Sequence, residues 1–339
     1  MKFYKYILII LFTTIIVLPS CKKVESENKV NKSSDTNKSS KNTVKSVSAK
    51  NKNGENKTKK IEFLDKTPKF ESINDAVKLR YKFKVGQKVN VVQFLKMSTR
   101  YNNSLTFMTT DIYGYYQIKK KLDDGKYELN WVISRIIIEL KSKNRKGEEQ
   151  ILKYDSDLKE NTMPNVEVFK NLINTSIKAK VDELGNLYDV DLKSFIDSMG
   201  GGASEDKLKE EVSQKAEQFM NISFIILPQK DIKTGDTYEG RKGAQKASLL
   251  KIESKRVYNV KAVSKDKELV LLKPAVDFEM NTDIEKQKIK IKKNKMTGWI
   301  LFDVKNGMLK ESYTHTRMSL KVNGVDMKMD MKSNFKIIK

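Results

Sequence analysis

Apolar and polar residues alternate in short runs from about residue 63 to the end of the chain, and Gly and Asn separate the runs. Alternation with a period of two is typical of strands that bury one face, and Gly and Asn are common in the turns between antiparallel strands. The pattern predicts a mainly β fold (β-rich α+β) with a large curved antiparallel sheet over residues 63–339. A few covering helices are expected in the middle of the chain, in an insert at about residues 165–222.

The clearest unit is the last hairpin. Asn323-Gly324 favours a two-residue type I′ turn. Around this turn a single register gives one apolar face and one polar face with two opposite-charge pairs, so the pairing is well specified. The expected pairs are Val322–Val325, Leu320–Met327 and Met318–Met329 on the apolar face, and Lys321–Asp326, Ser319–Lys328 and Arg317–Asp330 on the polar face.

Asp124-Gly125 predicts a second hairpin by the same reasoning. Its expected pairs are Leu122–Tyr127, Ile118–Trp131, Tyr116–Ile133 and Lys121–Glu128. Further strands are expected at residues 82–96, 177–181, 256–263, 269–273 and 288–292.

A third turn, Asn306-Gly307, joins a strand at residues 299–305 to the strand that follows it. In that second strand the apolar positions change parity between Leu309 and Met318. The change predicts a β-bulge near residues 314–317.

Helical periodicity is confined to the middle of the chain. Ser204 is a suitable N-cap for a helix over residues 204–221, and shorter helices are expected at 166–173 and 191–199. We expect these helices to cover one face of the sheet.

A weak internal repeat suggests two similar halves. Tyr-x-(Ile or Val)-Lys occurs at residues 116–119 and again at 258–261, and a Lys-x-Gly element occurs at 84–86 and 233–235. A duplicated half-sheet explains the repeat, and so does convergence of similar hairpins.

The first 20 residues have the features of a secretory signal. Two Lys residues precede an uncharged stretch whose most apolar part is too short to cross a hydrocarbon core of about 30 Å. Its end, Leu18-Pro19-Ser20-Cys21, resembles the bacterial lipobox, in which signal peptidase recognises Leu18 and Ser20. The resemblance implies that Cys21 becomes the first mature residue and carries diacylglycerol on sulfur and an acyl chain such as palmitate on nitrogen. An uncleaved anchor and an ordinary secretory signal with an incidental Cys are the alternatives.

Residues 21–62 are expected to form a disordered tether behind the lipidated Cys. Residues 22–60 contain 12 Lys, four acidic residues and no aromatic residue. Such a segment cannot bury enough apolar surface to offset the entropy of ordering it. A coil of this length reaches roughly 31–37 Å.

The motifs from Leu79 onward resemble an uncharacterised family of bacterial envelope lipoproteins and secreted proteins known as a domain of unknown function. The motifs are Arg80-Tyr81-x-Phe83-x-x-Gly86, Leu227-Pro228, Lys233-Thr234-Gly235-Asp236-Thr237-Tyr238 and Gly298-Trp299-x-Leu301-Phe302-Asp303. This resemblance implies no catalytic residue. In fold, the chain is also distantly similar to periplasmic lipoprotein carriers and receptors, whose concave face holds acyl chains.

The composition excludes several kinds of site. One Cys and one His cannot form a disulfide framework or a Cys- and His-rich metal site. His315 is expected on the surface without an orienting partner, and no pair of carboxylates stands out. We therefore expect no catalytic residue, cofactor or metal, and no enzyme activity.

Two groups of residues are candidates for binding. Met318, Leu320, Met327, Met329 and Met331 share one face of the last hairpin, and methionine is common where surfaces accept varied apolar ligands. The alternative is an ordinary core beneath the central helices.

The second group is the strand positions Lys288, Lys290 and Lys292, which project from one face and suit contact with an anionic surface. An edge strand protected by lysines is the alternative.

The formal charge of +24 suits anionic envelope partners better than nucleic acid, because only 7 of the 67 basic residues are Arg. The expected function is that of a lipid-anchored, non-enzymatic binding or scaffolding protein on the extracytoplasmic side of the cell envelope. Lys22, in place of an Asp after the Cys, favours the outer membrane. Expected partners are the membrane through Cys21, and lipid, lipoprotein or an anionic envelope polymer. The alternative function is a lipid or lipoprotein carrier that uses the Met-lined face.

Overall fold

The computed structural model describes residues 65–101, 104–143, 147–163, 166–191, 193, 220, 223–247, 250–282, 289–322 and 324–338. These residues belong to one compact unit. The predicted signal sequence with Leu18, Ser20 and Cys21, the predicted tether and Lys288 lie outside the described residues.

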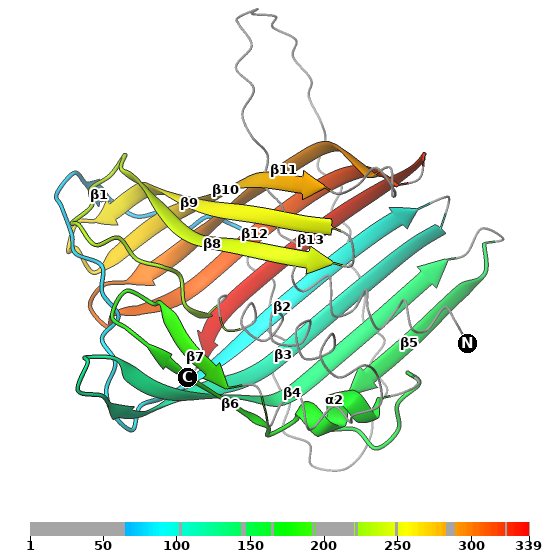
Figure 1. Cartoon of the computed structure of the whole chain (residues 1–339), viewed down its shortest axis with the longest axis horizontal. Helices are drawn as coiled ribbons and strands as arrows, with labels where there is room; N and C mark the ends of the chain where they lie inside the picture. The colour runs from blue at the N-terminus through cyan, green and yellow to red at the C-terminus, as the bar shows by residue number, and fades with distance from the viewer. Residues whose placement is uncertain are drawn as a thin grey trace, which may run out of the picture. The chain divides into compact units, whose positions relative to one another are not determined.

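Thirteen strands form one antiparallel sheet in the described part of the chain (Figure 1). They are β1 (Ser72–Ile73), β2 (Lys88–Tyr101), β3 (Ser104–Lys121), β4 (Tyr127–Lys143), β5 (Glu149–Asp155), β6 (Ser176–Val181), β7 (Leu187–Asp191), β8 (Thr237–Ala247), β9 (Leu250–Ser264), β10 (Leu269–Thr282), β11 (Ile289–Asp303), β12 (Met308–Val322) and β13 (Val325–Ile338). Their order is β1-β9-β10-β11-β12-β13-β2-β3-β4-β6-β7, with β5 beside β4 and β8 beside β9. The predicted antiparallel sheet is confirmed.

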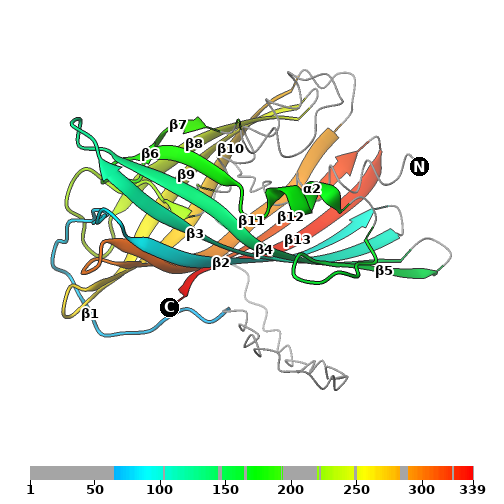
Figure 2. The same ribbon diagram turned by 90° about the horizontal axis from the view of Figure 1, so that it is seen from below.

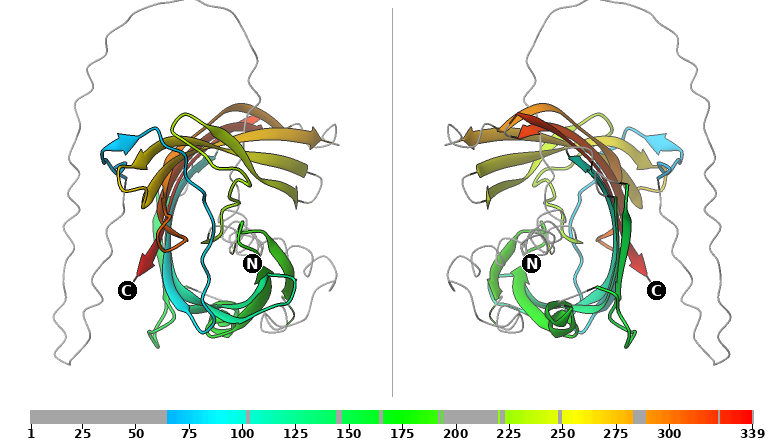
Figure 3. Two further views of the ribbon diagram at one scale, coloured as in Figure 1. Left: turned by 90° about the vertical axis from the view of Figure 1, so that its left-hand side faces the viewer. Right: turned by 90° about the vertical axis from the view of Figure 1, so that its right-hand side faces the viewer.

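The core lies on the concave face of this sheet. Figures 2 and 3 show the sheet curving, with the β6–β7 end and helix α2 (Glu167–Leu172) on the inner side. Trp131, Tyr154, Phe224 and Phe302 are among the largest side chains that are fully buried, and all four belong to one cluster. We call this the inner face and the opposite one the outer face.

The last hairpin has the predicted register along its whole length. Val322 pairs with Val325, Met318 with Met329 and Arg317 with Asp330. All six predicted pairs are present, and the ladder continues without a shift to Glu311 and Lys336.

The β3–β4 hairpin forms, but its predicted register is wrong. Lys121 pairs with Tyr127, so Leu122 lies in a loop of five residues instead of the last pair of a two-residue turn. The ladder shifts between Ile118 and Lys120, after which Ile118 pairs with Leu129. The shift is favourable because it sets two fully buried apolar side chains opposite each other.

The predicted bulge in β12 occurs earlier than expected. The register shift lies where Leu301 and Phe302 face Glu311 and Leu309, so Lys310 is the extra residue. Pairing through residues 314–317 is regular on both sides. Tyr313 has the same parity as Leu309 but is buried on the outer face, whereas Leu309 belongs to the core, so the apolar positions alone do not show where the parity changes.

Of the three predicted helices, the one at 166–173 is confirmed as α2. The helix expected at 204–221 lies outside the described residues except for Met220, which is helical and fully buried. Asp191 ends β7, and Lys193 is the described helical residue of the segment expected at 191–199. The region predicted as a helical insert therefore also contains strands β6 and β7.

The two halves of the sheet have equivalent backbone hydrogen bonds as well as similar sequence motifs. Strands β2-β3-β4-β6-β7 and β8-β9-β10-β11-β12 each follow one another across the sheet in chain order, with β13 between the sets. The matching bonds at the start of each set are Gly86 N to Ile118 O (2.9 Å) and Ile118 N to Gln87 O (2.9 Å), and Gly235 N to Val260 O (2.9 Å) and Val260 N to Asp236 O (2.8 Å). These bonds join the segments that carry the repeated motifs, so the two halves resemble each other in their backbone contacts as well.

The sheet opens between β10 and β11. These strands pair over four residues of β10, Leu269 to Leu272. Beyond that point β10 continues along β9, and β11 continues along β12. Among the described residues, the first part of β11 therefore pairs on one side alone.

Candidate functional site

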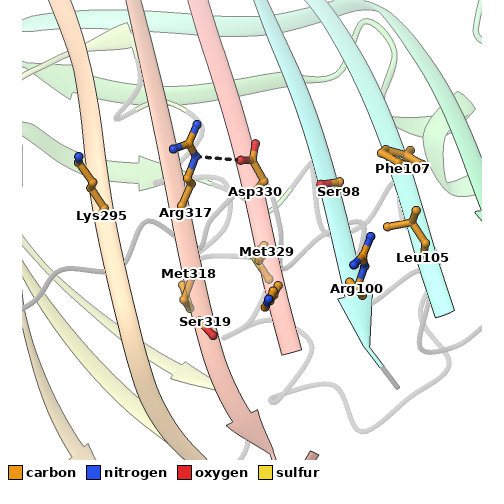
Figure 4. A pocket seen from close by; sticks show the side chains of 11 residues that line it. Ser98, Arg100, Leu105, Phe107, Lys295, Arg317, Met318, Ser319, Met329 and Asp330 are labelled. Carbon is orange, nitrogen blue, oxygen red and sulfur yellow. Dashed lines mark hydrogen bonds and ion pairs between the residues drawn. The ribbon is translucent and has the colours of Figure 1, made fainter. Parts of the chain in front are cut away.

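The outer face carries a continuous row of paired residues across seven strands. Paired residues on neighbouring antiparallel strands share a face, with Cβ atoms about 4.5–5.5 Å apart. From β11 to β5 the row is Lys295, Arg317, Asp330, Ser98, Phe107, Lys141 and Ile151. Figure 4 shows the first five of these side chains next to one another on their strands.

Two flanking rows are also rich in lysine and arginine. The row nearer the strand ends, from β12 to β5, is Ser319, Lys328, Arg100, Leu105, Lys143 and Glu149, and the row on the other side is Thr297, His315, Lys332, Lys96, Thr109, Glu139 and Lys153. The three rows together contain nine Lys or Arg and three carboxylates, which gives a net charge of +6. We call these three rows the basic face.

A depression of about 600 Å³ lies over β11, β12, β13, β2 and β3. Its lining is Ser98, Arg100, Leu105, Phe107, Lys295, Arg317, Met318, Ser319, Lys328, Met329 and Asp330. Four of these side chains are cationic and one is a carboxylate, so the lining carries a net charge of +3. Phe107 is 48% exposed and adds an apolar ring to it.

The carboxylates of the basic face are already engaged. Lys141 donates a hydrogen bond that lowers the pKa of Glu139, and Lys143 Nζ lies 3.2 Å from Glu149 Oε1. Asp330 accepts from Arg317 Nε at 3.2 Å. Among the described residues, Arg100, Lys295 and Lys328 form no ion pair, so their charge is available to an incoming anion.

The prediction that His315 is an exposed histidine without a partner is wrong. Its side chain is 11% exposed, and its Nε2 lies 3.0 Å from Asp330 Oδ2. The prediction considered Lys332, which lies directly opposite His315. The contact is instead to Asp330, two residues away on the same face of β13. Asp330 thus lies between His315 and Arg317, and it is Asp330 that lines the depression.

The methionine face is largely buried. Met318 is 6% exposed and Met331 is 3% exposed, while Met329 is partly buried against the core. Met331 pairs with Met97, which pairs with Met108, and both of these are buried as well. Met97 and Met108 are absent from the sequence prediction because nothing local indicates that β2 lies beside β13.

The other two predicted members of that face are less covered. Leu320 pairs with Met327, and Met327 pairs with Tyr101. Leu320 and Met327 are half-buried, and Tyr101 is 40% exposed. A partly exposed apolar row therefore remains at the strand ends of the inner face.

The predicted lysine strand lies beside the basic face. Lys290 pairs with Lys321, and Lys292 lies at the register shift between Ile291 and Lys293. Because this part of β11 is paired on one side alone among the described residues, its position is that of an edge strand. This agrees with the alternative in which lysines protect an edge.

The residues that carry the family resemblance hold the fold together. Arg80 donates to Glu183 Oε1 at 3.0 Å and to the carbonyls of Leu79, Pro228 and Gln229 at 2.6–2.8 Å. This set of bonds ties Arg80 to the loop before β8. The presence of Arg80 in the motif is therefore explained by its structural role.

The neighbouring Tyr81 has the same kind of role. Its hydroxyl accepts from Ile225 N at 3.0 Å, and its ring stacks on Phe83 with centroids 5.4 Å apart. The ring also lies edge-on to Phe302 at 5.5 Å. Tyr81 thus fixes the central loop against the sheet.

Within the described residues, His, Cys, Asp and Glu side chains do not gather in groups of three or more that suit a metal ion. The described helical segments include none with the length and apolar character needed to span a bilayer.

Comparison with known proteins shows no family. No family model and no curated protein matches the chain. Among solved structures, lipovitellin, from a study of its lipid–protein interactions, gives a TM-score of 0.47 at 6% identity, covering 76% of this chain and 26% of its own. The β domain of the Bordetella autotransporter BrkA gives 0.36 at 6% identity, covering 74% of this chain and 99% of its own.

An outer membrane channel from Pseudomonas putida F1 gives a TM-score of 0.25 at 5% identity, covering 76% of this chain and 97% of its own. All these scores lie below 0.5, so no functional conclusion comes from them. The likeness to the domain of unknown function remains a resemblance of motifs.

Proposed function

We propose that the protein is a lipid-anchored, non-enzymatic binding or scaffolding protein of the cell envelope that meets an anionic partner through its basic face. The observation that carries the proposal is the depression with a net charge of +3, in which three cations have no ion-pair partner among the described residues. A buried or paired cation costs energy to recruit, whereas an exposed and unpaired one attracts an anion without losing an existing contact.

The same geometry supports binding over catalysis. The carboxylates Glu139 and Asp330 of the basic face are held by Lys141 and Arg317. His315 contacts Asp330 but does not itself line the depression. A general base needs its imidazole or carboxylate within hydrogen-bond reach of the substrate proton. The residues that line the depression instead supply positive charge and one apolar ring.

The anchor is tested by the Cys21→Ala variant of the full chain. We expect the wild-type protein in the membrane fraction with the added mass of its acyl groups. The variant should lose that mass, because the acceptor sulfur is gone and several acyl chains are needed for stable anchoring. Fractionation with mass spectrometry of the mature chain gives both readouts, and Ser26→Ala in the tether is the control. A variant that stays in the membrane fraction at the mass of the wild type would contradict the anchor.

The second candidate is a lipid or lipoprotein carrier. It is favoured by the row Leu320, Met327 and Tyr101, which leaves apolar surface partly exposed on the inner face. An exposed apolar row on a concave face suits an acyl chain. Native mass spectrometry of the purified chain separates it from the first candidate, because a carrier retains lipid.

A further inference from the structure

We infer that the basic face docks on anionic phospholipid headgroups, so that the domain lies on a lipid surface with Phe107 at the level of the headgroups. The inference rests on the proposed function in one respect, because it names the anionic partner of the same face. It adds a chemical class and an orientation, and neither follows from the anchor alone.

The basic face sets cations opposite one another on neighbouring strands. Lys295 and Arg317 pair across β11 and β12, and Lys328 and Arg100 pair across β13 and β2. Each pair sets two like charges opposite each other, which is unfavourable unless an anion lies beside them; Asp330 is that anion for Arg317, and the described residues supply none for Lys295, Lys328 or Arg100. Phosphate groups satisfy this need, and the fork of a guanidinium binds phosphate oxygens in a bidentate way.

The apolar side chains distinguish a lipid surface from a polar polymer. Phe107 and Ile151 flank Lys141 in the central row of the basic face, and they are 48% and 50% exposed. Leu105 lies in the next row, between Arg100 and Lys143. Aromatic and aliphatic side chains beside cations are typical of surfaces that lie in the interfacial layer of a membrane. An aliphatic Ile151 gives no stacking platform for a sugar or a base.

Anchoring makes weak docking sufficient. A domain that a lipid anchor holds at the membrane meets the surface at an effective concentration of about millimolar, so docking does not need high intrinsic affinity. Each Lys near an anionic surface raises affinity roughly fivefold. The three unpaired cations of the depression therefore supply enough attraction to set the orientation of a tethered domain.

The test uses the unlipidated mature chain from Lys22, which retains every described residue, and measures its sedimentation with vesicles. Vesicles of phosphatidylcholine mixed with phosphatidylglycerol are compared with vesicles of phosphatidylcholine alone. The test variant is Lys295→Gln with Lys328→Gln. The matched control is Lys84→Gln with Lys310→Gln, which removes the same charge from exposed positions at the opposite strand ends.

We expect the wild-type chain to bind the anionic vesicles and the test variant to bind them roughly 25-fold more weakly, from two losses of about fivefold. The control should lose much less, and Phe107→Ala should weaken binding to vesicles more than binding to heparin. Circular dichroism checks that each variant is folded. All four residues of the two double variants are exposed, so a folded state is expected for both.

Two failures can be told apart. If the test variant loses heparin binding while no chain binds anionic vesicles, the lipid inference is overturned and the proposed anionic partner stands. If test and control variants behave alike with vesicles and with heparin, the basic face is not the binding surface and both proposals fall.

Discussion

Asp330 shows how a single residue sets the character of the basic face. Its carboxylate contacts Arg317 Nε at 3.2 Å and His315 Nε2 at 3.0 Å. The Arg317–Asp330 pair is exposed, and such a pair adds little to stability, typically less than about 1 kcal/mol. Its effect here is positional, because Asp330 holds Arg317 over the sheet and leaves Lys295 and Lys328 without a carboxylate of their own in the described region.

Tyr116 gives a prediction at the residue scale. Burial raises the pKa of its hydroxyl above the ordinary value of 10.0, and its side chain is 3% exposed. Because the pKa is higher in the folded state than in the unfolded chain, the folded state has its full stability below about pH 10. That stability is lost as the pH rises further and the hydroxyl ionises in the unfolded chain. Tyr116→Phe removes this ionisation, so we expect alkaline unfolding, followed by circular dichroism, to move to higher pH.

At neutral pH the same variant should change the free energy of unfolding by about 1 kcal/mol or less. Tyr115→Phe, on the other face of β3, is the matched control. Burial also raises the pKa of Tyr238, so the double variant with Tyr238→Phe should move the transition further. An alkaline midpoint that is the same in Tyr116→Phe and wild type would refute the assignment.

The β3–β4 ribbon carries the prediction at the scale of an element. Its ladder shifts between Tyr113 and Gly114, and a Cβ on Gly114 would lie 2.4 Å from the carbonyl oxygen of Val132. A backbone oxygen cannot rotate away, so Gly114→Ala must push β4 aside. We expect a loss of about 1–3 kcal/mol in the free energy of unfolding, measured with urea.

Ser104→Ala at the start of β3 is the control for that variant, and it should stay within about 0.5 kcal/mol of wild type. Hydrogen exchange should locate the loss in β3 and β4 if the contact is local. A Gly114→Ala protein as stable as the control would show that the ribbon relaxes without cost.

The terminal hairpin was predictable because its information is local. Asn323-Gly324 favours the turn, and two faces of different character fix the register, so the six pairs follow from the fourteen residues between Arg317 and Asp330. Around Asp124-Gly125 the turn is also local, but the loop takes in Leu122 and the strand is bulged after Ile118. A pattern with a period of two does not reveal where one extra residue enters a ladder.

The basic face was not predictable because its neighbours are distant in sequence. The pairs Arg317–Asp330 and Ser319–Lys328 follow from the hairpin, but nothing local places Ser98 beside Asp330 or Arg100 beside Lys328. These contacts join strands separated by more than 200 residues of chain. Lys290 and Lys292, which the sequence indicates on β11, lie beside this face, and the cations of β2 and β13 that contribute to it come from strands that are far apart in the sequence.

At the scale of the whole domain, the two faces of the sheet differ sharply at the same strand ends. Lys328 and Arg100 lie on the outer face, while Met327 and Tyr101, their chain neighbours, lie on the inner face. One end of the sheet therefore offers cations on one side and a partly exposed apolar row on the other. Docking through the basic face and holding a lipid on the inner face are compatible in space, so each must be tested by its own variant.

The carrier hypothesis is decided by what the purified chain contains. Met318 and Met331 are buried, so most of the inner face beneath the hairpin is already covered, and we expect native mass spectrometry of the mature chain to show a clean apo mass. A carrier would instead co-purify with lipid, and Met327→Asp would remove that lipid because a carboxylate in an apolar row is costly to bury. Lys321→Asp, on the outer side of the same hairpin, introduces the same side chain away from that row and is the matched control. Bound lipid that survives Lys321→Asp and disappears in Met327→Asp would make the carrier the better description of this protein, whereas an apo mass for all three chains leaves the basic face as its binding surface.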